Sequence, residues 1–99
     1  VEDWILDPGF GFAKTVEQNW QLLREMSVLQ EFGKDILVGL SRKSFLFRPL
    51  GITPAEALPS TQVADFIALQ NGADILRVHD VAEAVRTIKL YRLFNGVNN

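Results

Sequence analysis

The sequence predicts an α/β fold in which consecutive βα units build a parallel sheet. Three short apolar runs, which contain Ile5, Leu37 and Ile75, are each followed by a loop and a stretch with helical spacing, the pattern of repeated βα units. The runs do not alternate with polar residues, which is typical of parallel strands that are covered on both faces. An open doubly wound sheet and part of a (β/α)8 barrel both fit, and the spacing does not choose between them.

The first unit extends from a predicted strand at residues 4–6 to Gly33. Asp7 ends this strand, and a glycine-containing loop leads to Thr15 and Gln18, which have the spacing of a capping box. The helix that follows should end at Gly33, because glycine readily adopts the left-handed conformation that terminates helices. Its predicted buried stripe consists of Val16, Trp20, Leu22, Leu23, Met26 and Leu29.

The second unit begins with a predicted strand at residues 36–38. Residues 41–45 form a polar, basic stretch that we interpret as a loop or a helix start. A cap, a proline and a glutamate within residues 53–56 predict a short helix, and a longer helix is expected at 61–71. The residues of the longer helix that we expect to be buried are Ala64, Phe66, Ile67 and Ala68.

The third unit has a predicted strand at residues 75–78 and a last helix. Asp80, with Glu83 three residues on, is the predicted N-cap of that helix. Residues 95–99 are expected to form a frayed tail. The side of the helix that we expect to be apolar carries Val81, Val85, Ile88 and Tyr91 or Arg92.

The composition excludes several classes of function. The 99 residues are 47% hydrophobic and 22% charged, which is ordinary for a globular domain. The absence of cysteine excludes disulfides and thiolate chemistry, and a single histidine excludes a histidine-rich metal site. The net charge of −2 argues against a general nucleic-acid or anionic-membrane binder. With neither a signal-like start nor an apolar run of about 18 residues, we expect a cytoplasmic protein.

Ionisable residues gather where each predicted strand ends. Asp7 follows the first strand, Lys43 follows the second, and Arg77 and His79 lie at the third. Because parallel strands end at one rim, these groups should converge, and together they suit a polar ring and an anion. Taken singly, Asp7 before Pro-Gly is also a common turn residue, and His79 also suits a structural role. Arg77, placed inside a strand, should have an anionic partner, because burying an unpaired guanidinium is costly.

Three segments, at residues 7–14, 39–45 and 77–81, resemble three successive signature motifs of dihydropteroate synthase. The resemblance covers nearly the whole chain, and it implies a (β/α)8 barrel in which these segments follow the sixth, seventh and eighth strands. On this basis we favour the barrel over the open sheet. The resemblance also implies that residues 1–99 are the C-terminal fragment of the barrel domain, without synthase activity by themselves.

The family joins 6-hydroxymethyl-7,8-dihydropterin pyrophosphate to p-aminobenzoate in folate biosynthesis, releases pyrophosphate and is the target of sulfonamides. The resemblance assigns pterin binding to Asp7 and Lys43. It assigns p-aminobenzoate binding to Phe12, Ser41 and Lys43. A carboxylate that accepts two parallel hydrogen bonds from the pterin would orient the ring, and the Lys43 stem would pack beside the benzoate.

By the same resemblance, Arg77 and His79 would bind the pyrophosphate, and no residue is assigned as an acid or base. Mg²⁺ is implied for the whole enzyme, held through the pyrophosphate and N-terminal residues outside this chain, whereas the chain alone would bind none. Exposed sheet edges and apolar side chains, together with the family's dimer, lead us to expect a homodimer or other self-association.

Neighbouring residues receive simpler interpretations. Arg42 is expected to pair with a surface carboxylate, and Lys14 to be a loop cation. Asp65 lies where the family often has a small or amide residue, and the course of residues 45–61, with its prolines, departs from the family pattern.

Two alternatives remain open. A pterin-binding domain of a methyltetrahydrofolate methyltransferase shares the barrel and the pterin aspartate, but generally lacks a motif like Ser41–Lys43. A small α/β interaction module, in which the rim cluster is coincidental, is the other.

Overall fold

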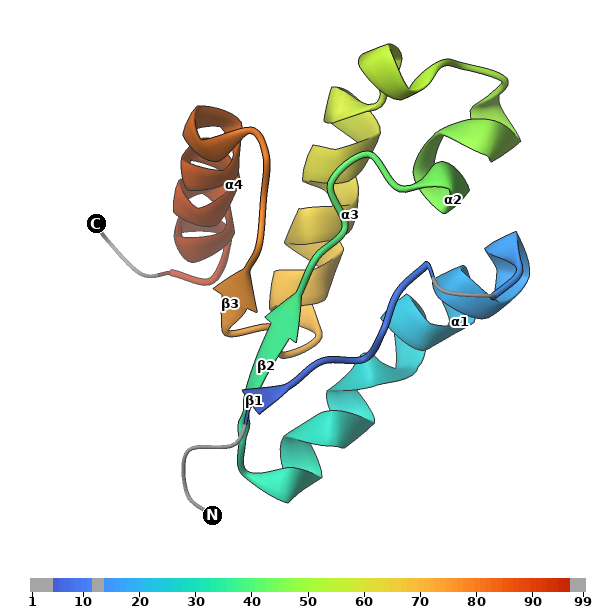
Figure 1. Ribbon diagram of the computed structural model, residues 1–99. Coiled ribbons are helices and arrows are strands. Elements are labelled where there is room, and N and C mark those ends of the chain that lie inside the picture. The colour runs from blue at the N-terminus through green and yellow to red at the C-terminus, as the bar shows by residue number, and fades with distance from the viewer. Residues whose placement is uncertain (1–4, 12–13, 97–99) are drawn as a thin grey trace.

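The computed structural model describes residues 5–11 and 14–96. Strands β1 (Ile5–Leu6), β2 (Asp35–Val38) and β3 (Ile75–Leu76) form one parallel sheet in the order β1-β2-β3. The loops that follow the strands leave toward the same end of the molecule (Figure 1). The predicted parallel βα units are therefore confirmed. Trp4, assigned to the first strand, lies outside the described residues.

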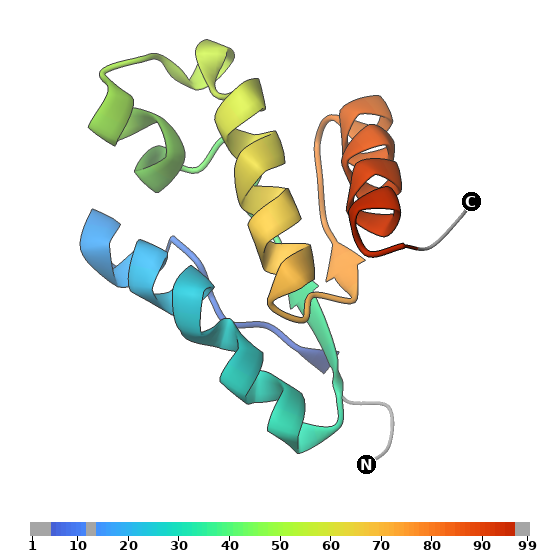
Figure 2. The same cartoon turned by 180° about the vertical axis from the view of Figure 1, so that it is seen from behind.

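The helical segments follow the strands as the sequence predicts. In chain order they are α1 (Val16–Glu25), the 3-10 helix η1 (Met26–Phe32), α2 (Ser44–Phe47), the 3-10 helices η2 (Arg48–Leu50) and η3 (Pro54–Glu56), α3 (Leu58–Gln70) and α4 (Val81–Phe94). Helices α1, α3 and α4 lie on one side of the sheet, as the two opposite views of the molecule in Figures 1 and 2 show. Within the described ranges, every helix is too short or too polar to cross a membrane.

The helix boundaries of the first unit agree with the local sequence. The Thr15 hydroxyl accepts a hydrogen bond from the Gln18 N–H at 3.0 Å, and the Gln18 side chain accepts one from the Thr15 N–H at 2.9 Å. This capping box was predicted. At the other end Gly33 has φ 65°, which a glycine adopts without a Cβ penalty. The change from α1 to a 3-10 helix at Met26 had no signal in the spacing.

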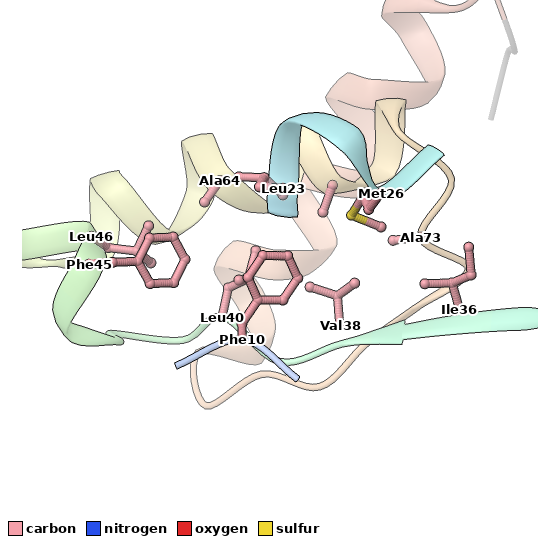
Figure 3. Packing of buried hydrophobic residues seen from close by; sticks show 11 residues of the cluster. Phe10, Leu23, Met26, Ile36, Val38, Leu40, Phe45, Leu46, Ala64 and Ala73 are labelled. Atoms are coloured by element: carbon pink, nitrogen blue, oxygen red, sulfur yellow. The ribbon is translucent and has the colours of Figure 1, made fainter. Parts of the chain in front are cut away.

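The core lies between the sheet and the helices (Figure 3). The ring of Phe10 stacks on that of Phe45 at 6.0 Å, and Trp20 meets Phe45 edge-on at 5.3 Å. Full burial of side chains of this kind contributes about 1.5–3 kcal/mol each. The buried cluster is Phe10, Leu23, Met26, Ile36, Val38, Leu40, Phe45, Leu46, Ala64, Ala68 and Ala73. It directly supports the loops at the ends of β1 and β2.

Burial alternates along β2, which corrects the expectation that helices cover both faces of the sheet. Ile36 and Val38 are buried, whereas Leu37 between them is half-buried. In the parallel register Leu37 is opposite Ile75, which is 36% exposed. Side chains at paired positions of parallel strands point to the same side. The described helices therefore pack on one face, as expected for the wall of a barrel.

Residues 45–61 contain short helices rather than one continuous helix. The capping box of Thr53 and Glu56 is present, but the segment it starts is the 3-10 helix η3. Helix α3 begins at Leu58, earlier than the predicted residue 61. Pro59 explains the difference, because proline is well tolerated in the first turn of a helix.

The predicted apolar side of α4 is partly wrong. Val81 and Val85 are 63% and 43% exposed, while the buried residues of α4 are Ala84 and Thr87. Apolar residues occur on more than one side of this helix, so the pattern alone did not identify the covered face. Small side chains at 84 and 87 allow α4 to approach α3 closely. The half-buried Tyr91 meets Phe66 of α3 edge-on, with 5.9 Å between the centroids of the two rings.

Candidate functional site

The loops after β2 and β3 line a small pocket at the carboxyl ends of these strands. Its volume is about 100 Å³, and its lining residues are Gly39, Ser41, Lys43, Arg77 and His79. Four of these, Ser41, Lys43, Arg77 and His79, were predicted site residues, and the structure brings them together around this pocket. An ammonium, a guanidinium and an imidazole around one small space suit an anion with several oxygens, such as a phosphate.

Lys43 connects the pocket to the loop after β1. Its Nζ donates a hydrogen bond to the Phe10 carbonyl oxygen at 2.7 Å. Burial is the main reason that the pKa of Lys43 is lowered, and the charge of Arg77 lowers it further, while Asp7 acts in the opposite direction. Asp7 therefore lies within electrostatic reach of the Lys43 ammonium.

Asp7 has the turn role that its sequence context predicts. Its Oδ1 accepts a hydrogen bond from the Gly9 N–H at 2.9 Å. The side chain is exposed, so a ligand that enters the rim can reach it. The turn bond orients the carboxylate and is compatible with the predicted pterin role. Phe12, the predicted benzoate contact in the same loop, lies outside the described residues.

Arg77 differs from its predicted environment. It follows β3 instead of lying within it, and it is exposed, so water can solvate the guanidinium and no buried anionic partner is required. The guanidinium lies close to Gly39, where an added Cβ would be 2.8 Å from its Nη2. Glycine at position 39 is therefore needed for this approach. Sequence analysis missed Gly39 as a site residue.

A hydrogen bond between the His79 backbone and the Ser41 side chain joins the two pocket loops. The His79 N–H donates a hydrogen bond to Ser41 Oγ at 3.1 Å. The Ser41 hydroxyl thus fixes the start of the loop that carries His79, and it keeps its own O–H for another acceptor.

The prediction that Arg42 pairs with a carboxylate is confirmed. Its Nε and Nη2 donate to the two oxygens of Asp80 at 3.2 and 3.1 Å. Asp80 is the N-cap residue of α4, as predicted, but its side chain makes no cap hydrogen bond. The carboxylate faces Arg42 instead. A cap and an ion-pair partner both favour aspartate, and the local sequence does not separate them.

The loop after β1 is held by residues on both sides. Lys14 is a loop cation, as predicted, and its Nζ donates to the Gly9 carbonyl oxygen at 2.7 Å. Asn19, buried in α1, accepts from the Gly11 N–H at 2.8 Å and donates to the Thr15 carbonyl oxygen at 3.0 Å. Asn19 was missed. An amide beside the apolar stripe, four residues after the cap, was the available signal.

A second, larger pocket has a different character. It has a volume of about 290 Å³ and lies among residues of α1, α2, η2 and α3 rather than at the rim. Its lining residues are Trp20, Phe45, Leu46, Pro49, Leu50, Ser60 and Val63. With no charged or titratable side chain in this lining, the pocket offers no group for the chemistry of the rim.

A magnesium site does not fit the described residues. Across 5–11 and 14–96, no three or more His, Asp or Glu side chains lie close enough together to hold a metal ion. Mg²⁺ prefers carboxylate and phosphate oxygens, whereas the rim pocket is lined by cations and neutral groups.

Comparison with known proteins identifies the family. The family model described as pterin binding enzyme matches residues 1–79. The chain belongs to the pterin-binding enzyme family. The match includes the rim segments at 7–14 and 39–45 and the first three residues, 77–79, of the segment at 77–81.

The relatives of this pterin-binding enzyme chain are consistent in name. It is 40% identical over 89 residues to dihydropteroate synthase of Escherichia coli K12, and 47% identical over 90 residues to that of a Synechocystis species. Each match covers 90% of the chain, but only 32% and 31% of the relatives. The chain thus spans about a third of the length of these curated relatives.

Solved structures support the same fold. The crystal structure of Yersinia pestis dihydropteroate synthase superposes with a TM-score of 0.90 at 39% identity, covering 94% of this chain and 44% of that one. The predicted fold class, three consecutive βα units of a (β/α)8 barrel, is confirmed, and the barrel is preferred to the open sheet.

Proposed function

We propose that the protein carrying this chain is a dihydropteroate synthase that joins the pterin of 6-hydroxymethyl-7,8-dihydropterin pyrophosphate to p-aminobenzoate. The observation that carries the proposal is the convergence of Ser41, Lys43, Arg77 and His79 on one pocket, with Asp7 near Lys43. The family membership and the names of the relatives support it.

In this proposal Asp7 and Lys43 hold the pterin. Asp7 accepts hydrogen bonds from the ring N–H and the exocyclic amine, a charge-assisted pair that also fixes the ring orientation. Lys43 donates to acceptors of the pterin ring. Burial and the neighbouring Arg77 lower the pKa of Lys43, while the negative charge of Asp7 acts in the opposite direction and favours the ammonium form.

Arg77 and His79 bind the diphosphate that leaves. Loss of pyrophosphate generates a cationic pterin methylene and a highly charged anion, so donors on the anion stabilise the transition state more than the ground state. The amino end of the 14-residue helix α4 follows His79 after Asp80, and its dipole adds to the attraction. Bond cleavage then requires no acid or base from these residues.

Ser41 and Phe12, together with the alkyl stem of Lys43, form the p-aminobenzoate side of the proposed site. Support comes from solved structures similar to this chain, which include a Yersinia pestis synthase with a pterin–sulfa conjugate and a Xanthomonas albilineans synthase with 4-aminobenzoic acid. The Ser41 hydroxyl is held at the rim by its bond with the His79 N–H.

Two other hypotheses about the function have less support. The motif at Ser41–Lys43 and the synthase names of the relatives favour the synthase over a methyltetrahydrofolate methyltransferase. Membership of an enzyme family argues against an interaction module with a coincidental cluster.

Other properties of the whole protein are part of the proposal. Self-association is supported by apolar side chains exposed on α4, where Leu90, Leu93 and Phe94 are each at least 60% exposed. Magnesium would be held through the pyrophosphate and residues outside this chain. A cytoplasmic location remains a prediction from the sequence.

The test measures synthase turnover by the protein that carries this chain and calorimetric binding of the pterin pyrophosphate. Asp7→Ala and Lys43→Ala should each weaken binding of the pterin pyrophosphate by about tenfold or more, since a charge-assisted hydrogen bond contributes about 1.5–3 kcal/mol. Lys89→Ala is the matched control, because it removes an exposed lysine of α4. Parent-like affinity in both rim variants would exclude these residues from the pterin site, and an inactive parent would exclude the synthase.

A further inference from the structure

Arg42 lies between two pocket residues, Ser41 and Lys43, but its own side chain is not part of the pocket lining. Four hydrogen bonds fix its guanidinium. Nε and Nη2 donate to both oxygens of Asp80, and Nη1 donates to the carbonyl oxygens of Pro54 and Ala55 at 3.0 and 3.1 Å. The planar fork of arginine suits this arrangement, which lysine cannot reproduce.

The backbone of Arg42 is equally constrained. Its φ of 54° is in the left-handed region, which is uncommon for a non-glycine residue. Its N–H donates to the hydroxyl of the buried Thr61 at 3.0 Å. A conformation of this kind is unfavourable for a residue with a Cβ and persists only where surrounding contacts impose it. The contacts of Arg42 with three separate segments supply that constraint.

These contacts join the two loops that build the pocket. On one loop, Arg42 is adjacent to Lys43. On the other loop, Asp80 comes directly after His79 and shortly after Arg77. Both ion-pair partners are about three-quarters buried, with side chains 28% and 25% exposed. Partial burial and bidentate geometry distinguish this pair from the exposed ion pairs that contribute little.

We propose that Arg42 is a positioning residue, whose pairing with Asp80 sets the separation between Lys43 and the Arg77–His79 side of the pocket and so determines the affinity for a diphosphate. The inference rests on the proposed function, because it takes pyrophosphate as the anion. It adds a role for a residue pair that does not itself contact the anion.

Simple electrostatics makes the opposite prediction for one variant. Asp80 is a negative charge beside an anion site, so its neutralisation should strengthen pyrophosphate binding if charge alone matters. If Asp80 acts by holding Arg42, the same change should weaken binding, because the two loops lose their shared clamp. Asp80→Asn keeps the size of the side chain and therefore separates the two effects by the sign of the change.

The experiment is calorimetric titration of the whole protein with inorganic pyrophosphate. We expect Asp80→Asn to raise the dissociation constant by about tenfold and Arg42→Lys by about fivefold, in the range of a lost charge-assisted contact transmitted to a neighbour. Glu83→Gln is the matched control, because it removes another carboxylate from the first turn of α4. Its affinity should equal the parent's or be slightly tighter. Circular dichroism at the titration temperature verifies that each variant is folded.

Unchanged or tighter binding by Asp80→Asn would overturn the inference. If that variant does not fold, Arg42→Lys decides, and affinity equal to the parent's would overturn the inference, since lysine keeps the charge but not the fork. A parent that binds no pyrophosphate would overturn the proposed function and this inference together. If the parent binds pyrophosphate and both variants bind it with the parent's affinity, this inference alone would be overturned.

Discussion

The rim of the sheet and the layer of helices place the same residue type in opposite surroundings. Asp7, at the rim, is exposed and accepts a hydrogen bond from a turn N–H. Asp65, in α3, is 2% exposed, and its Oδ1 has no hydrogen-bond partner among the described residues. Burial raises the pKa of Asp65 to about 6. The carboxyl group with the strongly displaced pKa is not among the residues that line the rim pocket.

This difference shows that a displaced pKa is not sufficient to locate a site. Within residues 5–11 and 14–96, desolvation accounts for the shift at Asp65, and no charged side chain there contributes to it. At Lys43 the shift also includes the charges of Arg77, Asp7 and Lys14, which are neighbours at the rim. Several charges acting on one group point to a binding site more specifically than burial does. Three predictions test this contrast.

The largest expected effect concerns the core beneath the rim. Phe45 is 1% exposed and contacts the rings of Phe10 and Trp20. Phe45→Ala should lower the free energy of unfolding by about 3–5 kcal/mol, because it removes ring contacts and leaves a cavity. Chemical denaturation measures the change. Phe32→Ala is the control, since Phe32 is 64% exposed, and an equal loss in both variants would contradict this description of the core.

The second prediction concerns Asp65 and pH. Its pKa of about 6 in the folded state exceeds the ordinary value of 3.8, so the folded protein holds this proton more tightly than the unfolded chain. The stability linked to Asp65 is complete below about pH 4 and is lost as pH rises through about 6. This loss should amount to about 2–3 kcal/mol.

Asp65→Asn should abolish this part of the pH dependence, which denaturation curves between pH 4 and 8 would measure. Asp35→Asn, at an exposed position of β2, is the control and should retain it. A parent and an Asp65→Asn variant with parallel pH profiles would show that the buried carboxyl group is not responsible.

The smallest effect is expected at the rim, and it should appear in binding rather than in stability. An alanine at position 39 would place its Cβ 2.8 Å from the Arg77 guanidinium, which is the flexible end of a side chain and can move away. Gly39→Ala should therefore weaken pyrophosphate binding by about tenfold, or about 1.4 kcal/mol, with little change in melting temperature. Gly51→Ala, where a Cβ would meet nothing within 4 Å, is the control for binding; its φ of 67° disfavours alanine, so this variant should lower the melting temperature without weakening binding.

Much of the fold could be predicted because its signals are local. The capping box of Thr15, the terminating Gly33 and the three apolar runs each depend on residues that are close in the chain. The buried face of α4 could not be predicted in this way. Whether Val85 or Ala84 is covered depends on how closely α3 approaches, which is a property of two helices.

The candidate site divides similarly. Lys43, Arg77 and His79 were predicted because each lies at or just after the end of a predicted strand, and parallel strands end at a common rim. The partner of Asp80 was not predicted, because Arg42 is 38 residues away in the chain and helix capping already accounted for an aspartate at that position. Gly39 was missed because its role depends on the guanidinium that lies over it.

The most direct measurement is a crystal structure of the whole protein with pyrophosphate bound. It should place the anion in the pocket at the ends of β2 and β3, with phosphate oxygens about 3 Å from the Arg77 guanidinium and the His79 imidazole. Lys43 should remain at the same rim, beside Asp7. An anion bound elsewhere, with Arg77 and His79 directed away from it, would contradict the central claim that these strand ends form one anion-binding site.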